Sequence, residues 1–491
     1  MTPTSQRIEI TREILTRIGS IADQENVEVY VVGGYVRDRL LGKDSTDLDI
    51  VVIGDGIAFA RTVAARLGRK QIVTFEKFGT AMLQLDGESK IEFVAAREES
   101  YESSSRKPAV KRATLESDLA RRDFTINAMA ASLNKNALGA IVDLFDGAAD
   151  LEKKIIRTPL PPEQTFDDDP LRMMRAIRFA SQLHFQIHAD TLEGIRRKAD
   201  RISIVSKERV TDEFLKILAS PKPSVGLMLL HETGLAKPVF PELVDMVGVE
   251  QRKDYHHKDV FLHTLKVVDN ICEATTNTWL RFTALVHDIA KPRTKAFKEG
   301  TGWTFHGHED LGARMMKSIF RRMRLPMDRL PYVEKLVRLH LRPMVMVSEE
   351  VTDSAIRRLL FDAGEDIDDL MALCRADITS QNPGRVARYL KNYDIVIEKM
   401  KEVEAKDRLR NWQPPVRGDE IMAVCGIPAG PLVGTLKTRI EEAILEGQIP
   451  NEHDAALNFL LEIKDSILQS PLDPGPDPGP NPGPDPELSP G

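Results

Sequence analysis

The chain has 491 residues and a formal net charge of -7. This length allows several domains with a core each, and the net negative charge means that a nucleic-acid partner would need a local basic patch. Its cysteines lie far apart, and it has neither an apolar leader nor an apolar run long enough to span a bilayer; we therefore predict no disulfide framework, no thiolate zinc site and no membrane contact, and we expect a cytoplasmic protein.

The first 150 residues alternate short β-rich segments with helical ones. The patterns predict helices over 7–25 and 58–67 and strands over 27–32, 48–53, 81–85, 91–95 and 140–144. Gly33 and Gly34 follow the first strand, and Asp47 and Asp49 lead into the second. Because strand side chains alternate between faces, the two aspartates point to the same side. We predict an α/β domain that ends near residue 150.

This aspartate pair suggests a Mg²⁺ site, because Mg²⁺ prefers carboxylate and phosphate oxygens. Two such ions would activate an attacking hydroxyl and neutralise a departing pyrophosphate. The glycine pair would let a triphosphate approach the backbone, and Arg37 would neutralise phosphate. Asp38 would brace the turn or, equally well, cap a helix over 39–41, and Glu92 is a candidate third carboxylate. An ordinary turn is the alternative for the whole Asp-x-Asp sequence.

Two further polar clusters follow. Residues 121–129 read Arg-Arg-Asp-Phe-Thr-Ile-Asn-Ala-Met, in which two residues suit phosphate and ribose contacts, namely Arg122 and Asn127. A polar, basic loop predicted over 101–118 precedes them and is either functional or simply solvated. Residues 167–179 begin with three aspartates and continue with arginines spaced by three on roughly one helix face, namely Arg172, Arg175 and Arg178.

The aspartates of the third cluster have two interpretations. At the start of a helix they cap it. Beside an arginine, an aspartate also reads a base edge, because the carboxylate accepts from an exocyclic amine while the guanidinium donates to a ring nitrogen or a carbonyl. Cytosine and adenine offer that amine, whereas uracil and guanine present a carbonyl that the carboxylate repels. Such a pair selects C and A without a nucleic-acid template.

Helical periodicity dominates from residue 171 to about 468, and the Pro/Gly repeats of 471–491 predict a disordered tail. Within the helical part, His287-Asp288 lies among apolar residues, where an unpaired carboxylate is unfavourable. Imidazole and carboxylate ligands suit Mn²⁺, Fe²⁺, Ni²⁺ or Zn²⁺, and such a site lowers the pKa of bound water for phosphate ester hydrolysis. Basic runs at 196–198 and 321–324 are candidate RNA-backbone contacts or solvated helix faces.

The ordered motifs over about residues 25–245 resemble class II tRNA nucleotidyltransferases, the CCA-adding enzymes of bacteria and eukaryotes. The resemblance makes 33–49 the catalytic metal motif, 121–128 the ribose-discriminating motif, 143–159 the hinge, 168–172 the amino-acid template and 206–209 a structural motif. It implies that Asp169 and Arg172 read the incoming base, and Asp168 stands where the family usually has Glu. The implied nucleotide-binding set comprises Gly33, Gly34, Arg37, Asp38, Arg122, Asp123, Asn127, Asp168, Asp169, Arg172, Arg175 and Arg178.

Residues 256–385 resemble the HD phosphohydrolase superfamily. The resemblance implies a core metal set of His263, His287, Asp288 and Asp377, with the extra histidines of two-metal members at His308 and His340. The alternative is a retained structural domain that helps to hold tRNA. The basic loop at 101–118 stands where complete CCA-adding enzymes carry a flexible loop needed for the A step, which favours full CCA addition.

We therefore expect an α+β protein whose N-terminal α/β head is polymerase-β-like with a mixed sheet. The predicted parts are a head (1–150), a helical neck and body (151–250), an HD domain (256–385), a helical tail (386–470) and the disordered tail (471–491). It would add CCA to tRNA from CTP and ATP with Mg²⁺, and its HD domain would hold a transition metal. The alternatives are a poly(A) polymerase, a CC-only or A-only enzyme, a phosphohydrolase with a relic head, and a non-catalytic RNA-binding protein. The sequence does not indicate the oligomeric state.

Overall fold

The computed structural model describes residues 6–45, 47–69, 71–76, 79–85, 90–100, 109–112, 114–250, 259–300, 302–348, 352–380, 382–407 and 414–469. Contacts divide the chain into two units: Met1–His340 with Ala372–Val386, and Leu341–Met371 with Ala387–Gly491. Within the described residues, no helix is both long and apolar enough to cross a membrane. The boundaries of the five predicted parts remain a prediction.

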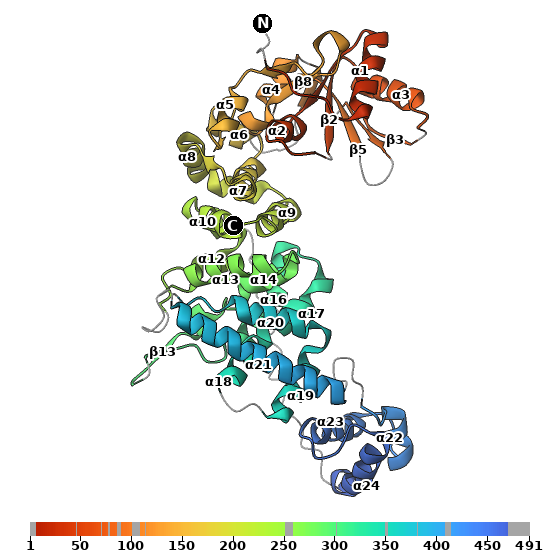
Figure 1. The fold of residues 1–491 in the computed structure, drawn as a ribbon, viewed down its shortest axis with the longest axis vertical. Coiled ribbons are helices and arrows are strands. Elements are labelled where there is room, and N and C mark those ends of the chain that lie inside the picture. Colours follow the sequence, from red (N-terminus) through yellow and green to blue (C-terminus); the bar gives the residue numbers. More distant parts are fainter. Residues whose placement is uncertain are drawn as a thin grey trace, which may run out of the picture. The chain divides into compact units, whose positions relative to one another are not determined.

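The first unit begins with a seven-stranded mixed sheet (Figure 1). In spatial order its strands are β3 (Ile72–Phe75), β4 (Thr80–Gln84), β5 (Lys90–Ala95), β2 (Leu48–Ile53), β1 (Glu28–Val32), β8 (Met129–Ser132) and β9 (Ile141–Asp143). The pair β2–β5 is parallel, and every other neighbouring pair is antiparallel. The central strands are rich in valine and isoleucine because both their faces are covered. The expected fold class, a head with a mixed sheet followed by helices, is confirmed.

Helices cover the sheet and connect its strands. These are α1 (Glu13–Glu25), α2 (Gly34–Leu40), α3 (Gly56–Arg66), α4 (Leu115–Ala120) and α5 (Gly147–Glu152), with short 3-10 turns η2 (Thr125–Asn127) and η3 (Lys135–Ala137). Asp55 caps α3 through its side chain, and Thr114 caps α4 in the same way. These caps help to define where each helix begins.

Two predictions about the head, and one of the two alternatives for Asp38, were wrong in detail. The first helix begins at Glu13, because the chain before it forms an antiparallel bridge: the Ile8 N–H donates to the Gly139 carbonyl, and the Ile141 N–H donates to the Gln6 carbonyl. Asp38 lies inside α2 and therefore does not cap a helix at 39–41. The predicted loop over 101–118 contains a strand and a helix where it is described: β7 (Ala109–Arg112) pairs with β6 (Arg97–Ser100), and α4 follows. Residues 101–108 and 113 lie outside the described residues.

Helices make up nearly all the rest of the first unit. A two-residue parallel ladder joins β10 (Ile155–Ile156) to β11 (Gln186–Ile187) among them. The helices are α6 (Pro162–Asp168), α7 (Leu171–Leu183), α8 (Ala189–Lys198), η4 (Ala199–Ile204), α9 (Lys207–Leu218), α10 (Pro223–Glu232), α11 (Ala236–Val239), α12 (Pro241–Asp245), α13 (Val260–Ala274), α14 (Thr278–Val286), α15 (Lys291–Thr294), α16 (His308–Met323), η5 (Met327–Arg329) and α17 (Leu330–Leu339). Buried aromatic rings pack edge to face or stacked in their core, namely Phe214, Phe240, Phe282 and Phe320.

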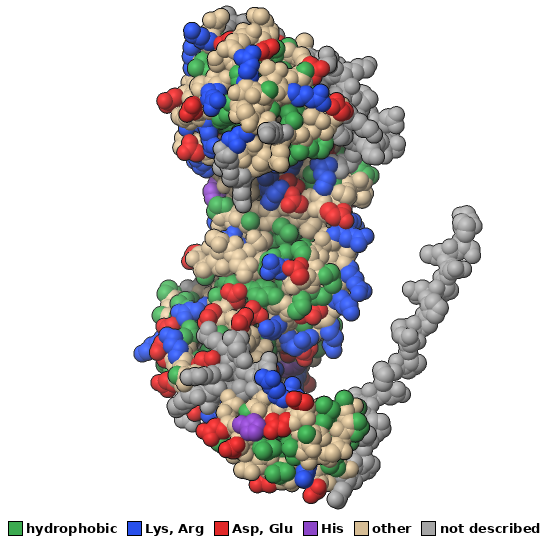
Figure 2. Space-filling model, turned by 90° about the vertical axis from the view of Figure 1, so that its right-hand side faces the viewer, with side chains coloured by type: hydrophobic (Ala, Val, Ile, Leu, Met, Phe, Trp, Pro, Cys, Tyr) green, Lys and Arg blue, Asp and Glu red, His purple; other side chains and the backbone are tan. Residues whose placement is uncertain are grey.

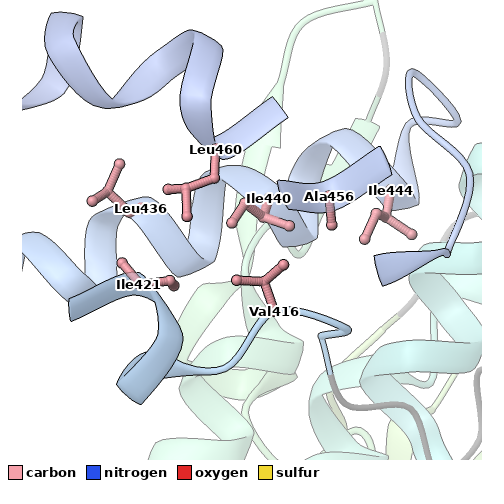
Figure 3. Packing of buried hydrophobic residues seen from close by; sticks show 7 residues of the cluster. All are labelled: Val416, Ile421, Leu436, Ile440, Ile444, Ala456 and Leu460. Carbon is pink, nitrogen blue, oxygen red and sulfur yellow. The ribbon is translucent and has the colours of Figure 1, made fainter. Parts of the chain in front are cut away.

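The second unit is helical in its described part. It contains α18 (Arg342–Ser348), α19 (Asp353–Ala363), η6 (Gly364–Asp366), α22 (Gly418–Cys425), α23 (Pro431–Leu445) and α24 (His453–Gln469), while α20 (Ile367–Ala376) and α21 (Pro383–Asp407) run across the unit boundary. Figure 3 shows the core formed by α22, α23, α24 and the segment before α22, with the side chains of Val416, Ile421, Leu436, Ile440, Ile444, Ala456 and Leu460. The predicted disordered tail, 471–491, lies outside the described residues.

Candidate active site

Three carboxylates lie at neighbouring positions of the sheet. Asp49 of β2 pairs in register with Glu92 of β5, and partners across a ladder point their side chains to the same face. Asp47 precedes β2 by one residue and Asp49 by two, and it is exposed. The structure thus brings together the pair predicted from strand alternation and the third candidate, Glu92.

The surroundings of these carboxylates fit a divalent cation. Burial raises the pKa of Asp49, the negative charge of Asp47 raises it further, and the Arg122 guanidinium opposes both. A cluster of carboxylate oxygens with a mutual charge repulsion is a donor set that a small, hard cation stabilises. Asp47 and Asp49 would hold such an ion, with Glu92 beside them.

A sharp glycine turn places α2 next to these carboxylates. Gly33 has a φ of +69°, and a Cβ atom at this position would lie 3.0 Å from Arg122 Nη1. Only glycine adopts this backbone conformation readily and also leaves room for the guanidinium. Gly34 is the first residue of α2.

Asp118 of α4 holds two arginines of the second cluster. Its Oδ1 accepts from Arg121 Nη2 at 2.5 Å, and its Oδ2 accepts from Arg122 Nη2 at 3.1 Å. Burial alone would raise the pKa of Asp118, but the guanidinium groups of Arg122 and Arg121 hold that pKa below its usual value. Sequence reasoning assigned Asp118 no role, although its spacing of three and four residues from these arginines on one helical turn was a usable signal.

A chain of hydrogen bonds through Asp123 connects three predicted motifs. Asp123 Oδ2 accepts from Arg175 Nε at 2.8 Å, and its Oδ1 accepts from the Asn127 amide at 3.0 Å. Arg37 in turn donates to Asn127 Oδ1 at 2.8 Å. Groups from α2, from the 121–129 segment and from α7 are thereby fixed relative to one another. Asp38 pairs with Arg37, its neighbour in α2, at 2.8 Å.

Three guanidinium groups surround the buried ring of Phe179. The central carbons of Arg37, Arg175 and Arg178 lie 5.3, 5.4 and 4.3 Å from its centre. Arg178 also pairs with Glu213 of α9 at 2.8 Å, a partner that sequence reasoning did not identify. Fixed cations of this kind, next to a carboxylate cluster, are suited to bind a polyphosphate.

The third cluster lies at the break between α6 and α7. Asp168 is the last residue of α6, and Asp169 Oδ1 accepts from the Leu171 N–H at 3.1 Å, so a capping role of Asp169 is present in the structure. Arg172 is 8% exposed and donates to the carbonyl oxygens of Arg121 and Thr165, at 2.5 and 3.4 Å. Arg172, one of the two candidate base-reading residues, therefore lies against the 121–129 segment.

The basic runs at 196–198 and 321–324 are largely paired with acidic groups of the first unit. Arg197 lies 3.0 Å from Glu163, Lys198 lies 2.8 Å from Asp167, and Arg322 lies 2.5 Å from Glu242. These contacts favour a structural role for the runs over one in RNA binding.

A second polar cluster lies in the helical part of the first unit, where all six predicted HD residues meet. Asp288 lies 3.5 Å from His263, 3.3 Å from His287, 3.2 Å from His308 and 3.8 Å from His340. Asp377 lies 2.9 Å from His263. The ligand atoms form two overlapping triads, each with its atoms within 4.8 Å of one another.

The imidazole groups of this cluster are oriented as metal ligands. His287, His308 and His340 each bond through Nδ1 to a backbone carbonyl, at 2.8, 2.6 and 2.6 Å. Their Nε2 atoms are buried and have no hydrogen-bond partner among the described residues. Such Nδ1 bonds fix the tautomer that presents an Nε2 lone pair, so the cluster fits a transition metal held by imidazole and carboxylate groups.

The Asp123–Arg175 contact predicts a pH-dependent stability of this candidate site. Burial alone would raise the pKa of Asp123, but Arg175 and Asn127 lower it to about 2, from an ordinary value of 3.8. Because the pKa in the folded state is the lower one, the stabilisation is present above about pH 4 and is lost as the pH falls towards 2. We expect Asp123→Asn to remove about 2 kcal/mol at neutral pH, a difference that shrinks on acidification.

Hydrogen exchange of the 124–132 amides between pH 7 and the lowest pH at which the protein stays folded would measure this loss, after correction for intrinsic exchange. The control is Asp44→Asn, because the Asp44 side chain is 87% exposed. Equal pH dependence in Asp123→Asn and in the unmodified chain would contradict the prediction.

Comparison with known proteins places both sites in known families. Models of the poly(A) polymerase head domain, of the probable RNA and SrmB-binding site of polymerase A and of the HD domain match residues 29–157, 184–246 and 260–381. The A-adding tRNA nucleotidyltransferase of Deinococcus radiodurans is 32% identical over 439 residues, which cover 87% of this chain and 93% of the relative. The CC-adding tRNA nucleotidyltransferase of Thermus thermophilus is 31% identical over 444 residues, or 88% and 93% of the two chains.

The fold also has a solved counterpart. The CCA-adding enzyme of Bacillus stearothermophilus, in complex with CTP, matches with a TM-score of 0.64 at 24% identity over 93% of this chain and 99% of that one. With relatives above 30% identity along nearly their full length, the chain belongs to the tRNA nucleotidyltransferases, a family of divalent-metal-dependent enzymes, and carries an HD domain.

Proposed function

We propose that this protein adds C, C and A in turn to the 3′ end of tRNA, using CTP and ATP and no nucleic-acid template. The observation that carries this proposal is the registered pair of Asp49 and Glu92, next to Asp47 and under the influence of Arg122 and Arg175. Acidic ligands beside guanidinium groups suit a metal-bound triphosphate. The relatives are tRNA nucleotidyltransferases, which supports tRNA as the acceptor. We accordingly propose that the protein acts in the cytoplasm.

Asp47 and Asp49 would hold Mg²⁺, with Glu92 as a third ligand or as a base for the attacking hydroxyl. Bound there, the metal supplies Lewis acidity for in-line displacement at the α-phosphate. Arg122, which Asp118 orients, would bind the phosphates beside the glycine turn at Gly33. These cations are fixed before substrate arrives, so little reorganisation accompanies binding.

Asn127 would contact the ribose, because Arg37 and Asp123 hold its amide in one orientation. Asp169 and Arg172 would read the base. Two of the five Arg172 N–H groups are used by described carbonyl oxygens, which leaves others for a base edge. A carboxylate beside them accepts the amine of cytosine or adenine and repels the carbonyl of uracil or guanine.

A second candidate is an enzyme that adds A alone to tRNA already ending in CC. The observation that favours it is the similarity to the Deinococcus radiodurans A-adding enzyme, which extends over as much of the chain as the similarity to the CC-adding enzyme.

We further propose that the HD cluster hydrolyses phosphate esters with a bound transition metal, such as Mn²⁺ or Ni²⁺. Its burial, its inward Nε2 atoms and the Lys291 ammonium group 2.6 Å from Asp288 support this proposal. A retained structural domain would not need three buried imidazole nitrogens that have no hydrogen-bond partner in the described part of the chain.

Addition of labelled nucleotides to tRNA lacking its 3′ end tests the first proposal. We expect two C and then one A, and we expect Asp49→Ala to reduce the rate by at least about 10²-fold, as loss of a positioned charge does. The control is Asp44→Ala, an exposed carboxylate of the preceding loop, which should retain activity. Addition of A only to tRNA ending in CC would support the second candidate, and long A tails would contradict both.

Asp169→Asn tests base reading, because an amide can donate as well as accept and so no longer repels a carbonyl. We expect the preference for CTP over UTP to fall by about 10- to 100-fold, the effect of one buried hydrogen-bond mismatch. The matched control is Asp167→Asn, since Asp167 pairs with Lys198 and Arg201 instead. The ratio of kcat/KM values for the two nucleotides is the measurement, and an unchanged ratio would remove Asp169 from this role.

Asp288→Asn tests the HD proposal, because it keeps the shape of the side chain but removes the charge shared by the four imidazoles. We expect this variant to lose its bound transition metal, measured by elemental analysis, and its ability to hydrolyse a 2′,3′-cyclic phosphate. Nucleotide addition should continue. Asp310→Asn, an exposed change on α16, is the control. Hydrolysis at the unmodified rate in Asp288→Asn would refute the assignment.

A further inference from the structure

A short hairpin projects from the helical part of the first unit, between the HD residues Asp288 and His308 (Figure 1). Its strands are β12 (Ala296–Lys298) and β13 (Gly302–Thr304), and all three residues of β12 are exposed. An isolated two-stranded hairpin is marginally stable, so its side chains matter either for its own stability or for a partner.

An aromatic pair spans this hairpin. Phe297 and Trp303 are partners in the ladder, and their ring centres lie 5.3 Å apart at an interplanar angle of 76°. Cross-strand aromatic pairs stabilise hairpins. Phe297 is nevertheless 67% exposed, more than any other large hydrophobic side chain among the described residues. The pair therefore holds the hairpin together and still presents an aromatic surface to solvent.

Basic groups accompany the aromatic pair. Residues 291–308 contain four Lys or Arg and one Glu, in a chain whose net charge is -7. Lys295 Nζ lies 4.3 Å from the centre of the Trp303 ring, and Arg293 and Lys298 are exposed. None of these three basic residues forms an ion pair with a residue that the structure describes. On the face shown in Figure 2, by contrast, basic and acidic side chains are interspersed.

We propose that this hairpin docks an unpaired stretch of RNA, with a base stacked on Phe297 and the flanking phosphates at Arg293 and Lys298. The proposal rests on the proposed function, since an enzyme that extends tRNA handles a single-stranded 3′ end. Stacking on an exposed ring requires a base with a free face, which unpaired RNA offers along its length and a duplex only at its ends, and cations without an ion-pair partner among the described residues complement phosphate. An acidic peptide would use the cations but leave the aromatic surface without a role.

The hairpin is also tied to the HD cluster. The Phe305 carbonyl accepts from His308 Nδ1 at 2.6 Å, and the Phe305 ring lies 5.6 Å from Lys291 Nζ. Lys291 in turn lies 2.6 Å from Asp288. The residues that follow β13 thus contact the proposed hydrolytic site directly, so docking here would deliver RNA to the region of that site.

Photo-crosslinking with the full-length protein tests the proposal. The probe is a single-stranded RNA of about ten nucleotides that carries 4-thiouridine, a length within the site sizes of single-strand binders. We expect cross-links to the peptide spanning 293–305, in addition to any in the head. Phe297→Ala and the double variant Arg293→Glu/Lys298→Glu should each reduce this cross-link by about tenfold, whereas Phe297→Tyr should retain it.

The matched control is Lys266→Glu/Lys317→Glu, which makes the same charge change at two exposed lysines of α13 and α16. The Arg293→Glu/Lys298→Glu variant leaves the aromatic pair intact, so a loss there does not reflect unfolding of the hairpin; hydrogen exchange of 296–304 checks this. No cross-link in the hairpin, equal loss in the control, or equal cross-linking of duplex RNA would overturn the proposal.

Nucleotide addition to tRNA, measured on the same preparations, separates this proposal from the proposed function. Protein that adds nucleotides but gives no hairpin cross-link overturns the docking site alone. Protein that cross-links at the hairpin but adds no nucleotide overturns the proposed function and leaves the docking site supported.

Discussion

The candidate nucleotide site depends first on one buried negative charge, the carboxylate of Asp123. It accepts hydrogen bonds from Arg175 and Asn127, and Asn127 accepts from Arg37. Three guanidinium groups around a single phenylalanine ring would repel one another without such a counter-charge. Asp118 and Glu213 play the same part for Arg122 and Arg178. The buried carboxylates thus fix the positions of the guanidinium groups, and these groups would bind a polyphosphate.

The two candidate metal sites differ in ligand type and in exposure, and each difference suits the chemistry proposed for that site. In the head, the ligands are carboxylates, and Asp47 is exposed, so substrate oxygens can complete a coordination shell. In the HD cluster, the ligands are chiefly imidazoles, the histidines are buried, and backbone carbonyls fix three of the rings. A site of the first kind suits an ion that arrives with its substrate, and one of the second kind suits a resident ion.

Local patterns were sufficient for much of the sheet and part of the site. The β-rich composition of residues 48–53 predicted β2 to the residue, and the alternation of strand side chains put Asp47 and Asp49 on one side. The strand β8 was missed because its sequence, Met-Ala-Ala-Ser, contains no β-branched residue, and it is a strand because β1 and β9 flank it. The start of α1 was misplaced for a similar reason, since a bridge from Arg7 to Ala140 competes with the helix.

Residues whose role depends on distant partners were harder to predict. Nothing near Glu213 in the sequence indicates that it pairs with Arg178. The HD residues come from separate helices and loops, and a resemblance to a family, rather than their spacing, linked them. The exposed ring of Phe297 in the β12–β13 hairpin was not predicted from the sequence, because exposure is a property of the fold.

The way in which the chain passes between its two units limits how the protein can be shortened. Residues 341–371 belong to the second unit but lie in sequence between His340 and Asp377 of the HD cluster. One face of α19 is buried, through Ile356, Leu359, Leu360 and Ala363, and Arg358 of that helix pairs with Glu446. A chain cut after Val386 would keep α19 and lose α22, α23 and α24. This fragment would retain every predicted HD ligand, but the apolar face of α19 would be uncovered. Poor solubility of the fragment would therefore give no information about catalysis.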